Sequence, residues 1–177
     1  GKGLTVDFRT VAAVIAVTSN NLPWPRQMRV TAPIIEAALR GIDPKTLGLG
    51  VMFEPLDKAV RIVNGDMSAL SGAKVSVFYL NCTGDYSKVT VDRHAVRVAL
   101  NHYTDEKETG RWVRPASRSR MIMEAAYYLA AQAYGEEPAI VQAIAWTVYR
   151  YSPEYKTGLG LSKAEKRATA KTRKTVA

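Results

Sequence analysis

The feature that most constrains the fold is a series of short segments with helical periodicity, separated by glycine and proline. Within these segments apolar residues recur three and four positions apart, which places them on one face of an α-helix. Glycine and proline between the segments mark where one helix ends and the next begins. The pattern predicts an all-α fold in which short loops join the helices.

In the first part of the chain, the pattern predicts a helix that starts at Asp7 and runs through the segment VAAVIAV. A second helical pattern covers residues 26–41; Pro33 ends or kinks it, and Gly41 closes it. Asp43-Pro44 and Glu54-Pro55 each have the form of a cap followed by proline at the first helical position. The second of these opens a helix that Gly65 stops.

Residues 70–84 are open to two interpretations. Their β-branched content would suit a strand, but Val75, Phe78, Tyr79 and Cys82 share one helical face, and Gly84 is a suitable C-cap. We prefer a helix. Asp92 then follows the extended stretch 89–91 and is predicted to cap another helix, because its carboxylate can accept the first backbone N–H groups.

The second part of the chain predicts two further helices after a charged loop at residues 104–117. The segment that ends at Gly135 is strongly helical in pattern. A last helix begins at Pro138, and its apolar stripe is predicted to bury Ile140, Ile144 and Val148.

The length of 177 residues suits one domain, which we place at residues 1–160. The tail, residues 161–177, has six basic residues and one acid, so it carries +5 of the net charge of +9. This balance favours a polyanion as partner, with nucleic acid first. Such tails are commonly just solvated, and at most this one adds non-specific phosphate contacts.

Several classes of protein are excluded by what the sequence lacks. It has a single cysteine and two separated histidines, so we expect no disulfide framework, no metal site and no cofactor. It has neither a phosphate-binding GxxxxGK[ST] loop nor a GxSxG elbow. It also shows no run of residues long and apolar enough to span a bilayer and no signal-peptide pattern, which predicts a soluble, cytoplasmic protein without a membrane partner.

The pair that could carry chemistry is Lys74 and Asp92, which lie 18 residues apart. This spacing allows one helix, a turn and the start of the next helix. An amine beside a carboxylate is a workable nucleophile and base. On periodicity alone, a surface lysine and a capping aspartate are the commoner explanation of such a pair.

The sequence around this pair resembles a known family. Val91-Asp92-x-His94-x-x-Arg97-Val98 is similar to the VDxHxxRV segment of the helix-hairpin-helix DNA glycosylase superfamily, of the endonuclease III and 8-oxoguanine glycosylase type. Leu70-Ser71-Gly72-Ala73-Lys74 is similar to the family's glycine-rich hairpin and the lysine that follows it. The resemblance covers roughly residues 8–102. It implies the helix-hairpin-helix glycosylase fold and DNA as the partner.

The resemblance also implies roles for particular residues. Lys74 would form a Schiff base with the sugar, and Asp92 would activate the nucleophile or stabilise the cationic sugar. Gly72, Ala73, His94 and Arg97 would contact DNA. The stretch that precedes the second helix is similar to the family's LSxQT-type segment, which implies a base pocket formed by Asn20, Asn21 and Trp24.

The chain departs from the family pattern at two places. Its hairpin has one glycine before the lysine, where the family normally has two, which reshapes the expected phosphate contact. An asparagine also stands where the family's segment has glutamine, which bears on the base that is recognised.

A cluster of arginines follows the region of resemblance. The cluster would suit a surface that follows a DNA backbone, and it consists of Arg111, Arg114, Arg118 and Arg120, interleaved with Trp112. A solvent-exposed charged segment that leads into the next helix explains these residues equally well.

Three functional hypotheses remain open. The first is a DNA glycosylase, with or without strand cleavage, that acts on a modified or damaged base in the cytoplasm, at the nucleoid or in an infected host cell. The second is a non-catalytic module, encoded by a phage or a mobile element, that binds DNA or a host protein. The third is an enzyme of base hypermodification. The sequence leaves the base and the oligomeric state open.

Overall fold

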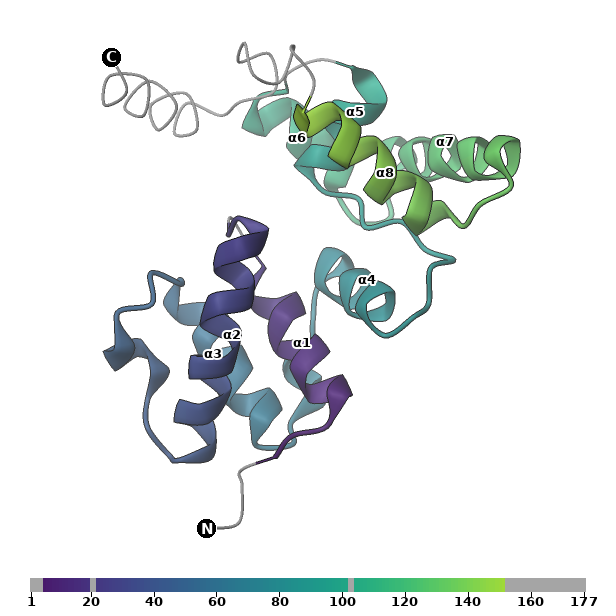
Figure 1. Ribbon diagram of the computed structural model, residues 1–177. Helices are drawn as coiled ribbons and strands as arrows, with labels where there is room; N and C mark the ends of the chain where they lie inside the picture. Colours follow the sequence, from purple (N-terminus) through teal and green to yellow (C-terminus); the bar gives the residue numbers. More distant parts are fainter. Residues whose placement is uncertain (1–4, 20–21, 102–103, 152–177) are drawn as a thin grey trace, which may run out of the picture. The chain divides into compact units, whose positions relative to one another are not determined.

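The computed structural model describes residues 5–19, 22–101 and 104–151, and every regular element in these ranges is helical (Figure 1). The prediction of an all-α fold is confirmed. The elements are α1 (Phe8–Thr18), α2 (Trp24–Leu39), η1 (Pro44–Leu47), α3 (Phe53–Val63), η2 (Met67–Ala69), α4 (Ala73–Cys82), α5 (Arg93–Leu100), α6 (Glu106–Val113), α7 (Arg118–Tyr134) and α8 (Pro138–Tyr151), where η marks a short 3-10 helix.

The chain divides into two compact units, Gly1–Asp85 and Tyr86–Ala177, which we call unit 1 and unit 2. Each unit has its own cluster of buried apolar side chains. The single domain over residues 1–160 stays a prediction, and the basic tail at 161–177 lies outside the described residues. The units are therefore described one at a time.

Helix α1 is the central element of unit 1. It packs against α2, α3 and α4, and its residues 12–18 are all buried. A helix that contributes alanine and valine on every side can be approached closely from several directions. The larger side chains of the core come from the neighbouring helices, and they include Ile34, Leu56 and Ile62.

The helix ends of unit 1 follow the glycine pattern. Asp7 caps α1, its carboxylate accepting the backbone N–H of Thr10 at 2.7 Å. Gly41, Gly65 and Gly84 follow α2, α3 and α4 in left-handed conformations, and each time the next residue donates back to the last turn of the helix. This arrangement satisfies carbonyls that would otherwise lack partners. The predicted ends of these three helices are confirmed.

In unit 1, one of the two alternatives predicted for Pro33 fails, and the predicted start of α3 is wrong. Helix α2 continues through Pro33 to Leu39, so the alternative in which the proline ends the helix fails; four residues after the proline are buried in the core, which offsets the missing hydrogen bond. Helix α3 begins at Phe53, with Met52 as N-cap, so Pro55 is at the third helical position. Asp43 does cap a helix with Pro44 first, but that helix is a 3-10 turn.

Helix α5 is the centre of unit 2 and packs against α6, α7 and α8. The buried cluster of unit 2 combines two valines of the segment 89–91 with residues of α5 and α7. Its members are Val89, Val91, Ala95, Val96, Met123 and Tyr127. Helix α7 ends at Gly135, as predicted; the structure adds that Ser117 caps its start and that Gly135 is left-handed. The helix preferred within residues 70–84 is confirmed as α4, and so is the helix capped by Asp92.

The prediction of a loop at residues 104–117 is wrong over most of its length. Residues 106–113 form α6, and the Asp105 carboxylate accepts the backbone N–H of Glu108 at 2.8 Å. The acidic first turn complements the positive end of the helix dipole. The charges that suggested a loop are therefore those of a helix start.

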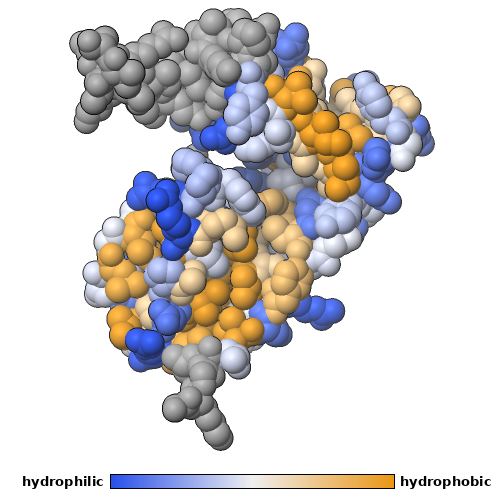
Figure 2. Space-filling model, in the orientation of Figure 1, coloured by the Kyte–Doolittle hydropathy of each residue, from blue (hydrophilic) through white to orange (hydrophobic). Residues whose placement is uncertain are grey.

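The predicted apolar stripe of α8 is also wrong. The buried residues are Pro138, Ala139 and Val141, whereas Ile144 and Val148 are exposed by 55% and 66%. Figure 2 shows apolar atoms over this helix on the face in view. Because α8 has apolar residues on more than one side, its periodicity alone did not determine which side faces the core.

Candidate functional site

Asp92 stands where the buried segment 89–91 joins helix α5. Val89 and Val91 are buried, and Asp92 itself has an extended backbone conformation. Its Oδ1 accepts the backbone N–H groups of His94 at 2.9 Å and Ala95 at 3.0 Å. These bonds hold one carboxylate oxygen at the N-terminus of α5, where the helix dipole also favours negative charge.

Tyr127 of α7 lies beneath the first turn of α5. Its phenol is buried and donates to the backbone carbonyl of Ala95 at 2.9 Å. Burial, followed by the negative charge of Asp92, raises the pKa of Tyr127. The phenol therefore stays protonated and keeps its donor for the Ala95 carbonyl.

An aromatic layer lies next to Asp92. The His94 ring approaches the Trp146 ring edge to face, with centroids 6.0 Å apart and planes at 76°. The guanidinium of Arg150 lies over the same Trp146 ring, 5.1 Å from its centroid. Both residues of α8 are half-buried, so this layer joins α5 and α8 through ring and cation contacts. His94, predicted to contact DNA, has this packing role in the structure.

Lys74 belongs to the first turn of α4 and is half-buried. Gly72 precedes this helix as N-cap with φ of 102°, a conformation that L side chains rarely adopt. Its carbonyl accepts the backbone N–H of Ser76 at 2.9 Å, and Ala73 is the first helical residue. The glycine therefore sets the direction in which the chain enters the helix that carries Lys74.

Lys74 and Asp92 fall in different units, Lys74 in unit 1 and Asp92 in unit 2. Each is at the beginning of a helix, as the spacing predicted. That the two groups face one substrate stays a prediction.

The predicted base pocket is described only in part. Asn20 and Asn21 lie outside the described residues. Trp24 opens α2 and is 51% exposed. An indole with this exposure keeps a face for stacking on another planar group.

Gln27, three residues after Trp24, is 1% exposed and was not among the predicted site residues. Its Nε2 donates to Thr18 Oγ1 at 2.7 Å and lies 3.3 Å from the carbonyl of Ile15, while its Oε1 has no hydrogen-bond partner. The helical periodicity of the sequence could have indicated its burial, since Gln27 shares a helical face with Val30, Thr31 and Ile34. This amide ties α2 to the end of α1.

Arg97 and Arg120 do not suit the predicted role in DNA contact. Arg97 is 3% exposed, and its Nη2 donates to the carbonyl of Thr104 at 2.9 Å. Arg120 is 7% exposed; it pairs with Glu124 at 2.8 Å and lies 3.3 Å from the carbonyl of Val113. Both guanidinium groups are used to join elements within unit 2, so we leave them out of the DNA interface.

The role of Arg97 can be tested by Arg97→Met, which keeps the length of the side chain and removes its donors. We expect the free energy of unfolding to fall by about 1–3 kcal/mol, because the buried Thr104 carbonyl loses its donor. Urea unfolding measures this change. Full stability together with a loss of DNA affinity would contradict the structural role and restore the predicted contact.

The remaining arginines of the cluster are accessible. Arg111 and Arg114 lie at the end of α6, Arg118 begins α7, and all three are exposed. Trp112 differs, since it packs against the buried cluster of unit 2. The cluster thus provides three accessible cations without the predicted stacking aromatic.

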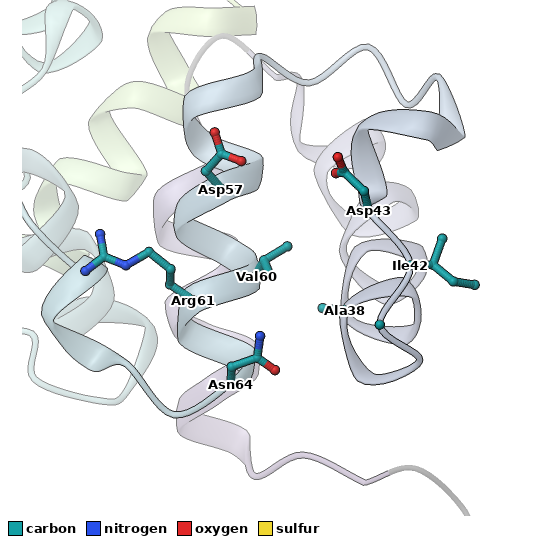
Figure 3. A pocket seen from close by; sticks show the side chains of 8 residues that line it. Ala38, Ile42, Asp43, Asp57, Val60, Arg61 and Asn64 are labelled. Atoms are coloured by element: carbon teal, nitrogen blue, oxygen red, sulfur yellow. The ribbon is translucent and has the colours of Figure 1, made fainter.

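Unit 1 also has a groove of about 570 Å³ between the end of α2 and helix α3 (Figure 3). Asp57 and Arg61 belong to α3 and Asn64 caps its end, while Ile42 and Asp43 come from the loop after α2. Its charged groups are satisfied locally: Asp57 pairs with Lys45, and Arg61 pairs with Asp66. None of the predicted site residues lines this groove.

Within residues 5–19, 22–101 and 104–151, no three metal-binding side chains lie close enough to hold an ion. In the same ranges, no helix is both long and apolar enough to cross a lipid bilayer.

The described structure defines an all-helical protein with an aspartate-capped helix beside an aromatic layer and three accessible arginines. The chain belongs to DUF7178, a family of unknown function, whose model matches residues 2–153. No curated protein and no solved structure matches the chain.

Proposed function

We propose that the protein is a DNA glycosylase-like enzyme that acts on a modified or damaged base. The observation that carries this proposal is the carboxylate of Asp92, held at the N-terminus of α5 by two backbone N–H groups directly after the buried segment 89–91. Its support from sequence is the resemblance of residues 91–98 to the VDxHxxRV segment of helix-hairpin-helix glycosylases.

The proposed reaction breaks the bond between the base and C1′ of the deoxyribose. The base leaves with the bonding electrons and takes up a proton, and positive charge develops on the sugar. The Asp92 carboxylate stabilises this charge, as carboxylates do in glycoside hydrolysis, or accepts a proton from the attacking nucleophile. The target nucleotide must first leave the base stack to be reached.

Lys74 is the proposed nucleophile. Its neutral amine forms a bond to C1′ as the base departs, and opening of the sugar ring gives a protonated Schiff base. Loss of a proton from C2′ then expels the 3′ phosphate and cleaves the strand. In a version without strand cleavage, Asp92 alone activates a water molecule and Lys74 contacts phosphate.

The direct test is incubation of the full chain with duplexes that contain a panel of altered bases. Release of a free base, detected by mass spectrometry, supports the proposal. The same products separate it from base hypermodification, which would leave a larger nucleoside in the strand. Absence of base release across the panel rejects the enzymatic proposal.

The exposed arginines support DNA as the partner. The double change Arg111→Glu with Arg114→Glu is expected to weaken duplex binding by about tenfold or more and to flatten its salt dependence, because fewer counterions are released. Fluorescence anisotropy over a range of salt concentrations measures both effects.

The control for this prediction is Arg9→Glu with Arg40→Glu, which changes the net charge equally at two exposed positions of unit 1. If both double variants weaken binding to the same extent, overall charge explains the binding and the cluster has no particular role.

The second candidate is a DNA-binding module without turnover. The accessible arginines favour it independently of Asp92, and the hairpin has only one glycine before Lys74. This reading predicts that Asp92→Asn leaves cellular function unchanged, whereas the double arginine variant removes it. Loss of activity with unchanged DNA affinity in Asp92→Asn would exclude the module.

A further inference from the structure

The segment that leads to Asp92 is held by one side chain of α8. The Oε1 of Gln142 accepts the backbone N–H of Thr90 at 2.9 Å, and its Nε2 donates to the carbonyl of the same residue at 2.5 Å. A side-chain amide has one acceptor and one donor group, so it can pair with both polar groups of one peptide residue. The Gln142 side chain therefore supplies both hydrogen-bond partners of the Thr90 backbone.

This pairing meets a physical requirement of the segment. Thr90 is 8% exposed, and buried backbone groups need hydrogen-bond partners. The backbone N–H of Val91 donates to the carbonyl of Val89 at 3.1 Å, which closes a tight turn with Thr90 at its centre. Such a turn directs the N–H and C=O of its central residue outward, where Gln142 meets them.

Helix α8 holds the same stretch of chain at a second point. The backbone N–H of Ala139 donates to the carbonyl of Tyr86 at 3.0 Å. On the other side of the stretch, Val89 and Val91 are 2% and 1% exposed within the core of unit 2. The chain between Tyr86 and Val91 is thus fixed by α8 and by the core, and Asp92 is the next residue.

We propose that Gln142 is a positioning residue, which holds Thr90 so that the Asp92 carboxylate is presented in one fixed orientation. This inference rests on the proposed function, since it assigns Gln142 a part in the reaction through Asp92. Gln142 itself is not placed at the substrate. Reactions that depend on a held carboxylate are sensitive to displacements of about 1 Å, which can change rates by about a hundredfold.

The test uses Gln142→Met in the full chain, which keeps a side chain of similar length and removes both hydrogen bonds. The matched control is Val141→Ala, a change in the adjacent residue of α8 that removes buried apolar volume and leaves the Thr90 pairing intact. If Gln142→Met fails to fold, Gln142→Glu replaces it, because the carboxylate still accepts from Thr90 but has no donor for the carbonyl.

Two measurements are made on each variant. Amide hydrogen exchange at Thr90, His94 and Ala95 reports on the segment and on the cap of α5. Single-turnover base release and duplex affinity report on the reaction. For Gln142→Met we expect amide exchange at these positions to be about tenfold faster. We expect base release to be slower by about tenfold to a hundredfold, with unchanged affinity for the duplex. Val141→Ala should keep the wild-type rate.

The outcomes separate the inference from the proposed function. Unchanged exchange at His94 and Ala95, or base release at the wild-type rate, in a folded Gln142 variant overturns the positioning role while the wild-type protein still turns over. An equal loss of rate in Val141→Ala also overturns it, because general destabilisation then explains the effect. If the wild-type protein releases no base, the proposed function fails and the positioning role falls with it, even where exchange shows that Gln142 holds the segment.

Discussion

Asp92→Asn is expected to slow base release by about 10²–10⁴-fold while the protein stays folded and bound to DNA. Asparagine caps helices about as well as aspartate, so the hydrogen bonds to the N–H groups of His94 and Ala95 can be kept. The amide has no negative charge to stabilise the sugar cation and no basic oxygen to accept a proton. The loss of a positioned acid or base typically costs about 10²–10⁴ in rate. Single-turnover base release measures the effect.

Asp105→Asn is the matched control for this change. Asp105 caps α6 in the same unit, and its carboxylate accepts the backbone N–H of Glu108 at 2.8 Å. The two variants therefore make the same chemical change at the same kind of position. If Asp92→Asn releases base at the rate of Asp105→Asn, the aspartate of α5 is only a helix cap and the catalytic role is wrong.

Lys74→Gln is expected to remove strand cleavage and the covalent intermediate. The amide cannot form a Schiff base, so borohydride has nothing to reduce. Base release is expected to fall by at least about a hundredfold if the amine attacks the sugar directly. Separation of the reacted duplexes on denaturing gels measures strand cleavage, and the same gels show any protein linked to DNA after borohydride treatment.

Lys58→Gln provides the control for the lysine. Lys58 is half-buried, belongs to the same unit and pairs with Glu54 at 2.9 Å on an accessible helix face. A surface ion pair of this kind contributes little to stability, so the folded protein should keep its activity. Retained cleavage in Lys74→Gln would instead assign Lys74 to a phosphate contact or to the surface of unit 1.

Local signals in the sequence predicted much of the helical architecture. Asp7, Asp92 and the glycines after α2, α3 and α4 act within a few residues of their own helix ends, so short-range patterns suffice to locate them. The position of Asp92 at the start of α5 was predicted in the same way. The helix preferred for residues 70–84 forms as α4 at Ala73–Cys82. It has no buried residue, yet its apolar face and Gly84 were enough to predict it.

Features that depend on packing between elements were not predicted. Contacts with α5 and α7 decide which face of α8 is buried. As a result Val141 faces the core and Ile144 faces outward. Helix α6 was taken for a loop since its charges were counted without its cap, Asp105. The α8 error thus depends on tertiary packing, whereas the Asp105 cap of α6 is a local signal that the sequence already contained.

The candidate site shows the same limit. Residues 91–98 pointed to Asp92, but the burial of Arg97 follows from a hydrogen bond to Thr104, which the motif does not reveal. The contact between Gln142 and Thr90 joins residues 52 positions apart. A pairing at this separation depends on the tertiary fold and has no signature in the local sequence.

The most direct measurement of the central claim is borohydride trapping of the wild-type chain on duplexes that contain an abasic site or an altered base, followed by peptide mapping of the adduct. The account predicts a covalent adduct on the peptide that contains Lys74, together with free base from at least one altered duplex. An adduct on another lysine would contradict the assignment of Lys74. No adduct and no released base across the whole panel would contradict the proposed chemistry.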